Sequence, residues 1–307
     1  MARILITGIT GRIGLSLLGD LEKLFDLQDE IFLLESSSKI KLPKDFKLKL
    51  YVEKEFGNNY DLAIHLAAIS DTTYCAKKEN ETQVRAVNID LTKKVCDISR
   101  KVIFMSTDYV FNGKLKPGET FDEYGLKDPI NEYGKSKAEG EEIVLSHNGI
   151  VIRVETMMGT KNRVIDAVMP VITGEKIDYL PLWSNNSIRP SYYPDFLEVL
   201  KRAKDRTGPK IYHVSCSGKA LSRLEMAEIA LEAFKEFGGI SNVEKLKSCE
   251  APETKTFILG TDKTRDELKV EFTDSREAIR KHIARDLNNL SYKLVLSNIA
   301  KDKLEKF

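Results

Sequence analysis

The sequence predicts an α/β protein with a doubly wound parallel sheet, followed by a smaller mixed α/β domain. Short apolar runs alternate with longer amphipathic stretches through the first half of the chain, which is the rhythm of β-α-β units. After residue 154 this rhythm stops, and shorter segments are separated by Pro170, Pro181, Pro190 and Pro194. Two strongly helical patterns then close this second part.

The expected strands are 2–7, 31–34, 61–67, 102–105 and 150–154. The expected helices follow the first strand to about residue 25 and then cover 79–99, 131–146, 223–237 and 274–288. This alternation indicates a doubly wound sheet over residues 1–155, with a return segment near 185–203. We expect the substrate-binding domain to occupy most of residues 156–307.

Composition narrows the class of protein. The 307 residues are 42% hydrophobic and 31% charged, which is typical of a folded protein with a sizeable core. Lys and Arg number 48 against 47 Asp and Glu, so we expect no nucleic-acid partner and no membrane attraction. The four cysteines form no CxxC pair, which argues against a disulfide framework or a zinc site. The first apolar run ends at Thr7, too early for a signal or membrane segment, and we expect a cytoplasmic protein.

Three glycines follow the first expected strand at three-residue intervals. Gly8, Gly11 and Gly14 lie between that strand and the next helix, in a GxxGxxG spacing. The first glycine permits a tight turn, the second lets backbone N–H groups approach a pyrophosphate, and the third lets the helix pack on the sheet. The loop therefore predicts a Rossmann domain that binds NAD or NADP.

The residues after the second strand bear on the choice of cofactor. Glu35 lies about 20 residues past the last glycine, where a carboxylate can accept hydrogen bonds from the adenosine ribose, and this favours NAD. Arg12 in the glycine loop and Lys39 can neutralise a 2′-phosphate, and this favours NADP. The choice between the two cofactors stays open.

A tyrosine and a lysine four residues apart lie on one face of the expected helix 131–146. Near neutral pH the phenol of Tyr133 can act as acid or base if a neighbouring cation stabilises the phenolate. Lys137, together with a positively charged nicotinamide, can supply that charge. Thr107 follows the strand 102–105 at the carboxyl edge of the sheet, where it can hydrogen-bond a reacting oxygen. The three residues predict an NAD(P)-dependent oxidoreductase.

Taken together, these residues resemble the extended short-chain dehydrogenase/reductases. The runs STDYVFNG at 106–113 and YGKSKAEGE at 133–141 look like those of dTDP-4-dehydrorhamnose reductases in particular. The similarity extends through 61–68 and 87–88, and a weaker likeness continues at 189–195 and 212–215. It covers most of the first 155 residues and leaves a homodimer open.

The resemblance implies reduction of the C4 ketone of a nucleotide-linked deoxysugar, such as a dTDP-linked 4-keto sugar. Tyr133 would protonate the alkoxide, Lys137 would bind the nicotinamide ribose, and Thr107 would polarise the carbonyl. Tyr109 would line the substrate pocket, and Arg189 would bind the pyrophosphate of the substrate. The implied cofactor-binding residues are Gly8, Thr10, Gly11, Arg12, Ile13, Gly14, Glu35, His65, Ala67, Ala68, Ser106, Tyr133 and Lys137.

The chain departs from the family where the sugar should lie. After Arg153 the family usually carries a Trp-Val-Tyr run, and this chain has VETMM at 154–158, so the identity of the sugar stays open. The acidic pair that the family carries after its Ala-Ala turn is replaced by Thr73 and Ala76. We therefore expect no metal.

Two other interpretations of the same residues remain. A nucleotide-sugar epimerase can use the same Thr/Tyr/Lys set while keeping its cofactor bound. A non-catalytic NADP-binding subunit, such as the regulatory β subunit of methionine adenosyltransferase, resembles the same reductases, and fold analogy does not remove it. A 4,6-dehydratase is disfavoured because those enzymes follow the catalytic Thr with Asp-Glu, whereas Asp108 is followed here by Tyr109.

Overall fold

A seven-stranded parallel sheet forms the centre of the protein. A computed structural model describes residues 1–34, 46–53, 55–116, 118–160, 168, 171, 178–236 and 243–288. The strand order is β11-β6-β5-β4-β1-β2-β3. From β1 the chain first adds strands on one side, β2 and β3, and then adds β4 and the later strands on the other side. The doubly wound parallel fold is therefore confirmed. The strands are β1 (Arg3–Thr7), β2 (Glu30–Leu34), β3 (Lys49–Glu53), β4 (Leu62–His65), β5 (Val102–Thr107), β6 (Ile150–Val154) and β11 (Lys210–Val214).

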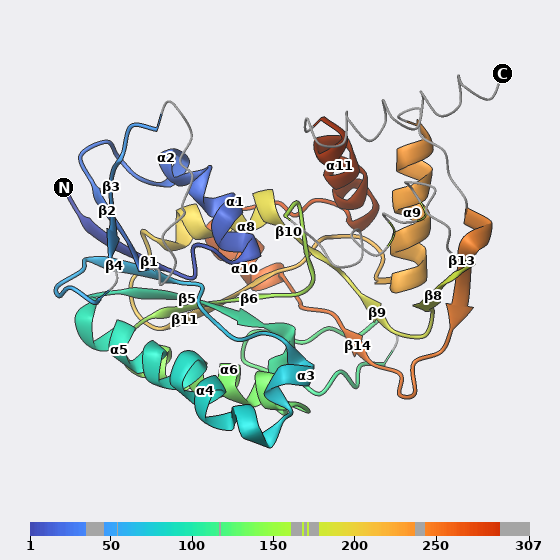
Figure 1. Ribbon diagram of the computed structural model, residues 1–307, viewed down its shortest axis with the longest axis horizontal. Helices are drawn as coiled ribbons and strands as arrows, with labels where there is room; N and C mark the ends of the chain where they lie inside the picture. The colour runs from blue at the N-terminus through green and yellow to red at the C-terminus, as the bar shows by residue number, and fades with distance from the viewer. Residues whose placement is uncertain are drawn as a thin grey trace.

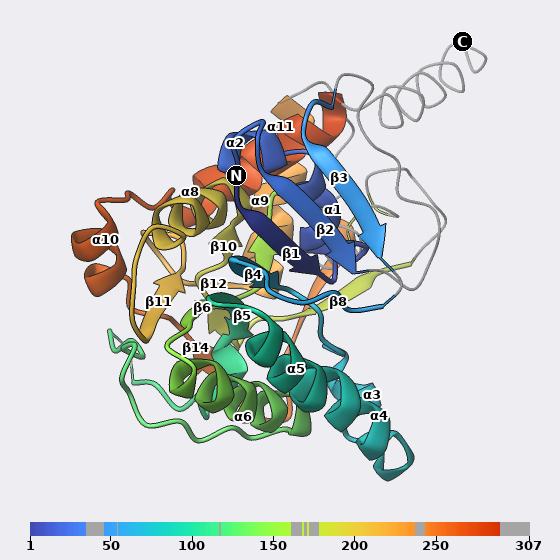
Figure 2. The same ribbon diagram turned by 90° about the vertical axis from the view of Figure 1, so that its left-hand side faces the viewer.

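Helices cover both faces of this sheet (Figures 1 and 2). One face carries α1 (Arg12–Leu18), α2 (Leu21–Leu24), α8 (Tyr193–Ala203) and α10 (Asp262–Leu268). The other carries α4 (Glu81–Arg85), α5 (Leu91–Ile98) and α6 (Glu132–Ser146), with the short α3 (Thr72–Cys75) beside α6. The alternation along β1 explains this layering, since Ile4 and Ile6 join the core of the first face while Leu5 joins that of the second.

The second half of the chain packs against the carboxyl ends of the sheet. Its helices α9 (Arg223–Glu236) and α11 (Ser275–Asn288) enclose a separate apolar core and lie beside each other in Figure 1. Around them lie short strands: β7 (Met157–Met158) with β10 (Ser191–Tyr192), β8 (Leu180–Trp183) with β13 (Leu246–Cys249), and β9 (Ser187–Ile188) between β12 (Leu221–Ser222) and β14 (Thr256–Phe257). Among the described helices, none is long and apolar enough to cross a membrane.

Several boundaries differ from the sequence-based expectation. The first helix stops at Gly19, and α2 forms separately. The expected helix 79–99 contains a π-helical turn, Ala86–Asp90, between α4 and α5. The chain also returns to the sheet further than 185–203, because β11 joins the edge next to β6. Strand β3 was not expected, and its mostly exposed side chains carry little of the alternating apolar signal that predicts a strand.

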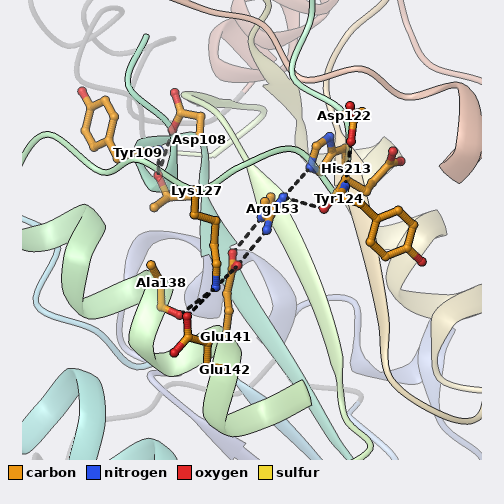
Figure 3. Close-up of polar contacts among 12 residues, drawn as sticks. Asp108, Tyr109, Asp122, Tyr124, Lys127, Ala138, Glu141, Glu142, Arg153 and His213 are labelled. Carbon is orange, nitrogen blue, oxygen red and sulfur yellow. Dashed lines mark hydrogen bonds and ion pairs between the residues drawn. The ribbon is translucent and has the colours of Figure 1, made fainter. Parts of the chain in front are cut away.

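A buried ion pair fixes α6 against the sheet. The guanidinium of Arg153, on β6, donates from Nε and Nη2 to the two carboxylate oxygens of Glu141, on α6, each over 2.8 Å. Its Nη1 lies 3.0 Å from the Glu123 carbonyl oxygen and 3.2 Å from His213 Nε2 on β11 (Figure 3). Arg153 is 1% exposed, so these contacts replace the water that a charge otherwise requires.

We expect Glu141→Gln to lower the free energy of unfolding by about 3–5 kcal/mol, because it leaves the buried Arg153 charge without its counter-charge. The double variant Glu141→Leu/Arg153→Met should be more stable than this single variant, since no buried charge remains. Urea unfolding followed by the fluorescence of Trp183, the one tryptophan of the sequence, measures both. Glu277→Gln, which breaks the exposed pair with Lys281, is the control and should leave stability nearly unchanged. A double variant less stable than Glu141→Gln would contradict this account.

Candidate functional site

Three adjacent strands bring the expected site residues to one edge of the sheet. Thr7 at the end of β1 pairs with His65 at the end of β4, and Thr107 ends β5. Because parallel strands end at the same edge, residues from distant parts of the sequence meet there. This edge also lies at the reversal of strand order between β1 and β4, the usual position of a ligand crevice in such sheets.

The glycine loop leaves β1 in a tight turn. Gly8 has φ +72°, and a Cβ on it would lie 2.5 Å from the backbone nitrogen of Ala67. A Cβ on Gly14 would lie 2.3 Å from the Gly8 carbonyl oxygen, so the start of α1 packs directly on the loop. Helix α1 then begins at Arg12 without a side-chain cap and without an acidic residue in its first turn. Its first amide groups are therefore available to an anion.

The remaining residues of the loop face outward. Thr10, Gly11 and Arg12 are exposed, and Ile13 is half-buried. Glu35 and Lys39, on which the choice of cofactor was argued, lie outside the described residues. Of the three residues that bear on the choice between NAD and NADP, the structure describes Arg12.

His65 lies beneath the loop. Its ring is fully buried between two hydroxyls, with Nδ1 2.6 Å from Thr7 Oγ1 and Nε2 2.9 Å from Thr92 Oγ1. Burial lowers the pKa of His65 to about 3, so the ring is neutral. Thr7 Oγ1 in turn accepts the N–H of Ala67 at 3.3 Å. His65 thereby holds the backbone that leads to the half-buried Ala67 and Ala68.

The start of α6 lies directly against the end of β5. Asn131 caps the helix, and its side chain accepts the N–H of Gly134 at 2.7 Å. A Cβ on Gly134 would lie 2.0 Å from the Tyr109 carbonyl oxygen, so only glycine permits this approach. The close contact brings Tyr133 near Thr107, whose hydroxyl acts on the pKa of the Tyr133 phenol.

The environment of Tyr133 keeps its phenol protonated. Burial raises the pKa of Tyr133, and the nearby Asp108 carboxylate raises it further, while the hydrogen bond with Thr107 lowers it. That Lys137 lowers this pKa together with a positively charged nicotinamide stays a prediction. Among the described side chains, burial and Asp108 give a net rise.

Lys137 is buried beside an aromatic ring. It is 2% exposed, and its Nζ lies 3.6 Å from the centroid of the Phe104 ring. Burial lowers the pKa of Lys137 to about 7, and Glu141 opposes this shift. The ammonium group is therefore easily deprotonated near neutral pH, unlike an exposed lysine.

A buried asparagine locks α6 to the loop after β4. Asn88, in the π-helical turn, accepts the N–H of Ile69 at 2.8 Å and donates to the Ile69 carbonyl oxygen at 3.1 Å. It also donates to Ser136 Oγ at 2.9 Å, which donates to the Tyr133 carbonyl oxygen at 2.8 Å. These bonds engage both the oxygen and the nitrogen of the Asn88 amide group, so Asn88 holds the start of α6 against this loop.

Two buried carboxyl groups, Asp108 beside Thr107 and Glu155 near Asp108, received no role from the sequence. Thr107 Oγ1 donates to Asp108 Oδ1 over 2.8 Å. Glu155 follows β6, and its carboxylate accepts hydrogen bonds from Ser215 Oγ, Leu259 N and Arg189 N at 2.9–3.0 Å. Burial raises the pKa of Glu155, and the Asp108 charge raises it further. Glu155 lies in the run 154–158, which departs from the family pattern. That departure was the one sign in the sequence that this position differs.

A pocket of about 360 Å³ opens beside these residues, between the sheet edge and the second half of the chain. Tyr109 lines it, with its ring edge-on to those of Tyr133 and Phe257 at centroid distances of 6.2 and 5.2 Å. The wall from the second half includes Trp183 and Arg223, whose guanidinium lies 5.0 Å from the Trp183 ring. The pocket can therefore hold a molecule with both apolar and anionic parts.

Arg189 and Ser106 lie at the margins of this site. Arg189 Nη2 donates to the Leu259 carbonyl oxygen at 3.0 Å, and Arg189 is not among the residues that line the pocket. Its assignment to a substrate pyrophosphate stays a prediction. Within the described part of the chain, the buried Ser106 Oγ has no hydrogen-bond partner. Such an orphaned hydroxyl beside Thr107 fits a site that accepts a polar ligand.

The fold defines an α/β protein with a doubly wound parallel sheet. The chain matches the RmlD substrate binding domain family over residues 2–288 and belongs to that family.

Two curated relatives differ in their descriptions. Methionine adenosyltransferase 2 subunit beta of Xenopus tropicalis is 28% identical over 160 residues, which are 47% of this chain and 45% of that protein. The match thus spans about half the length of that relative. Spore coat polysaccharide biosynthesis protein SpsK of Bacillus subtilis is 27% identical over 223 residues, covering 71% of this chain and 75% of that protein.

Solved structures share the fold. A dTDP-4-dehydrorhamnose reductase of Bacillus anthracis in complex with NADP has a TM-score of 0.73 at 20% identity, covering 93% of this chain and 99% of its own. A UDP-glucuronic acid 4-epimerase of Bacillus cereus in complex with NAD has a TM-score of 0.69 at 18% identity, covering 92% and 99%. At these identities the likeness concerns the fold alone.

Burial makes the stability of the protein depend on the protonation of Asp108. Burial raises the pKa of Asp108 from 3.8 to about 6, so the folded protein retains a proton in this window that the unfolded chain has released. Stability should therefore fall as pH rises from about 4 to about 6, by ~3 kcal/mol for this group. Asp108→Asn should remove this contribution, as urea unfolding at a series of pH values measures. The exposed control Asp122→Asn should keep it, and equal pH slopes in Asp108→Asn and wild type would refute the assignment.

Proposed function

We propose that the protein is an NAD(P)H-dependent reductase of the 4-keto group of a nucleotide-linked deoxysugar, such as a dTDP-linked 4-keto sugar. The observation that carries this proposal is the pair of Thr107 and Tyr133, which lie close together beside the pocket that Tyr109 lines. The pair lies at the sheet edge shared with the glycine loop. Membership of the RmlD substrate binding domain family supports the same class of substrate.

The residues of the sheet edge fit a dinucleotide. The backbone cradle at Gly8 and Gly14 has no room for a Cβ, and the uncapped start of α1 offers amide groups to a pyrophosphate. Ser106 Oγ is a buried hydroxyl in need of a partner. When bound, NADH or NADPH supplies the hydride for reduction. Solved relatives contain either cofactor, and Glu35 and Arg12 support opposite preferences, so we propose NADP or NAD.

Each catalytic side chain then has a defined task. Tyr133 donates its phenolic proton to the reacting oxygen, and its raised pKa keeps that proton in place until charge develops. Thr107 hydrogen-bonds the same oxygen. Lys137, on the same face of α6, orients the nicotinamide ribose, and Arg189 contacts the substrate from the second half of the chain. Tyr109 excludes water from one wall of the pocket.

A second function is favoured by a specific observation. The curated relatives named methionine adenosyltransferase 2 subunit beta match about half of this chain, at 28% identity. A cofactor-binding regulatory subunit is therefore the alternative class. A nucleotide-sugar epimerase is a third candidate, supported by the fold likeness to UDP-glucuronic acid 4-epimerases.

Tyr133→Phe should reduce the rate of ketone reduction by about 10²- to 10⁴-fold, because it removes the general acid and little else. The assay follows consumption of NADPH or NADH with a dTDP-linked 4-keto sugar. Tyr124→Phe is the matched control, since Tyr124 is 71% exposed, and should keep the wild-type rate. Conversion of sugar without net consumption of reduced cofactor would indicate the epimerase. A wild type that turns over no such sugar, yet binds cofactor, would contradict the reductase and favour the regulatory subunit.

Gly11→Ala should weaken cofactor binding while the protein stays folded. A Cβ on Gly11 meets only the Gly8 carbonyl oxygen, at 3.1 Å, so the side chain would project from the exposed loop toward the pyrophosphate. Thermal unfolding with and without NADPH or NADH measures this, because a ligand of the native state raises the unfolding temperature. Gly19→Ala, at the end of α1, is the control and should retain the full shift. An undiminished shift in Gly11→Ala would place the cofactor elsewhere.

A further inference from the structure

The hydroxyl of Thr107 has one hydrogen. Asp108, a Tyr133 phenolate and a substrate carbonyl can each accept it. Thr107 Oγ1 donates that hydrogen to Asp108 Oδ1 over 2.8 Å, and it accepts the N–H of Tyr109 at 3.3 Å. A hydroxyl whose hydrogen is engaged offers only lone pairs to other groups. A substrate carbonyl and a Tyr133 phenolate are both acceptors, so each needs the hydrogen that Asp108 takes. Thr107 therefore cannot polarise a carbonyl while Asp108 holds its hydrogen.

Asp108 is placed so that it can carry a proton. It is 7% exposed, and its charge raises the pKa of the nearby Glu155 carboxyl group. Burial raises the pKa of Asp108 to about 6. Among the described residues, the other titratable groups around this cluster include Tyr133 from α6, Tyr109, and Cys75 from α3, with Arg189 and Cys216 beside Glu155.

Asp108 also reaches the substrate pocket, where it can exchange protons with solvent. It lines the pocket together with Tyr109, opposite Arg223, Glu253 and Lys255 of the second half. In Figure 3, no dashed line joins Asp108 or Tyr109 to the ion pair of Arg153 and Glu141.

Building on the proposed reductase function, we propose that Asp108 is a positioning residue that sets the direction of the Thr107 hydroxyl. With its proton, Asp108 donates to Thr107 Oγ1, and the Thr107 hydrogen turns to the substrate oxygen and stabilises the Tyr133 phenolate after proton transfer. Without its proton, Asp108 takes the Thr107 hydrogen, and the reacting oxygen loses a donor. No covalent bond of Thr107 forms or breaks in this step; only its hydroxyl group rotates.

The proposal predicts how activity depends on pH. Because the productive state needs protonated Asp108, kcat/KM should fall as pH rises through about 6. The nearby backbone N–H groups of residues 108 and 109 lower the pKa of this carboxyl, so they favour an oxygen atom in their direction. An asparagine at position 108 therefore keeps its oxygen on them and directs its NH₂ group to Thr107. That donor does not titrate.

The experiment compares pH profiles of kcat/KM for NADPH-dependent reduction of a dTDP-linked 4-keto sugar. Asp108→Asn should remove the fall above about pH 6, whereas Asp108→Ala, without a donor, should be about tenfold slower throughout. Asp122→Asn should keep the wild-type profile. An Asp108→Asn profile that still falls like that of wild type would overturn the proposal, and so would Asp108→Asn and Asp108→Ala being equally slow.

A second measurement does not depend on activity. Infrared difference spectra of wild type against Asp108→Asn should contain the C=O band of a protonated carboxyl that disappears as pH rises through about 6. Asp122→Asn should retain this band. Its absence from wild type would overturn the proposal even in an active enzyme. If wild type shows the band but reduces no sugar, the assigned reaction fails while the protonation of Asp108 stands.

Discussion

The buried charge of Arg153 is the constraint on which the site depends. A guanidinium with 1% exposure must find its hydrogen-bond acceptors within the protein, and it finds the principal pair on Glu141 of α6. Tyr133, Lys137 and Glu141 are spaced four residues apart, so they share one face of that helix. The ion pair that satisfies Arg153 therefore also turns Tyr133 and Lys137 toward the carboxyl ends of β4 and β5.

The same burial sets the protonation states at the site. Desolvation raises the pKa values of Tyr133 and Asp108 and lowers that of Lys137, so each is shifted toward its uncharged form. A reaction that creates an oxyanion here must then rely on oriented hydrogen bonds rather than on a resident charge. The direction of the single hydrogen of Thr107 therefore matters, because Asp108 accepts that hydrogen in the structure.

Local patterns predicted the parts of this arrangement that local physics determines. The alternation of apolar runs predicted β1, β2, β4, β5 and β6, since each is buried on both faces. The GxxGxxG and YxxxK spacings indicated where a loop and a helix face would lie. Strand β3 is largely exposed, and the π-helical turn at Asn88 follows from its contacts with Ile69 and Ser136. Neither leaves a periodic signal, so both were missed.

Glu155 shows why the remaining chemistry was not predicted. Its three hydrogen-bond donors come from residues 189, 215 and 259, segments that are adjacent only after the second half folds onto the sheet edge. From the sequence, the run 154–158 was visible only as a departure from the family. In the fold, that departure places Glu155 near Asp108, whose charge raises the pKa of Glu155, and Asp108 in turn accepts the hydrogen of Thr107. The run that distinguishes this chain from its family thus joins the polar groups around Thr107, a connection that exists only in the folded chain.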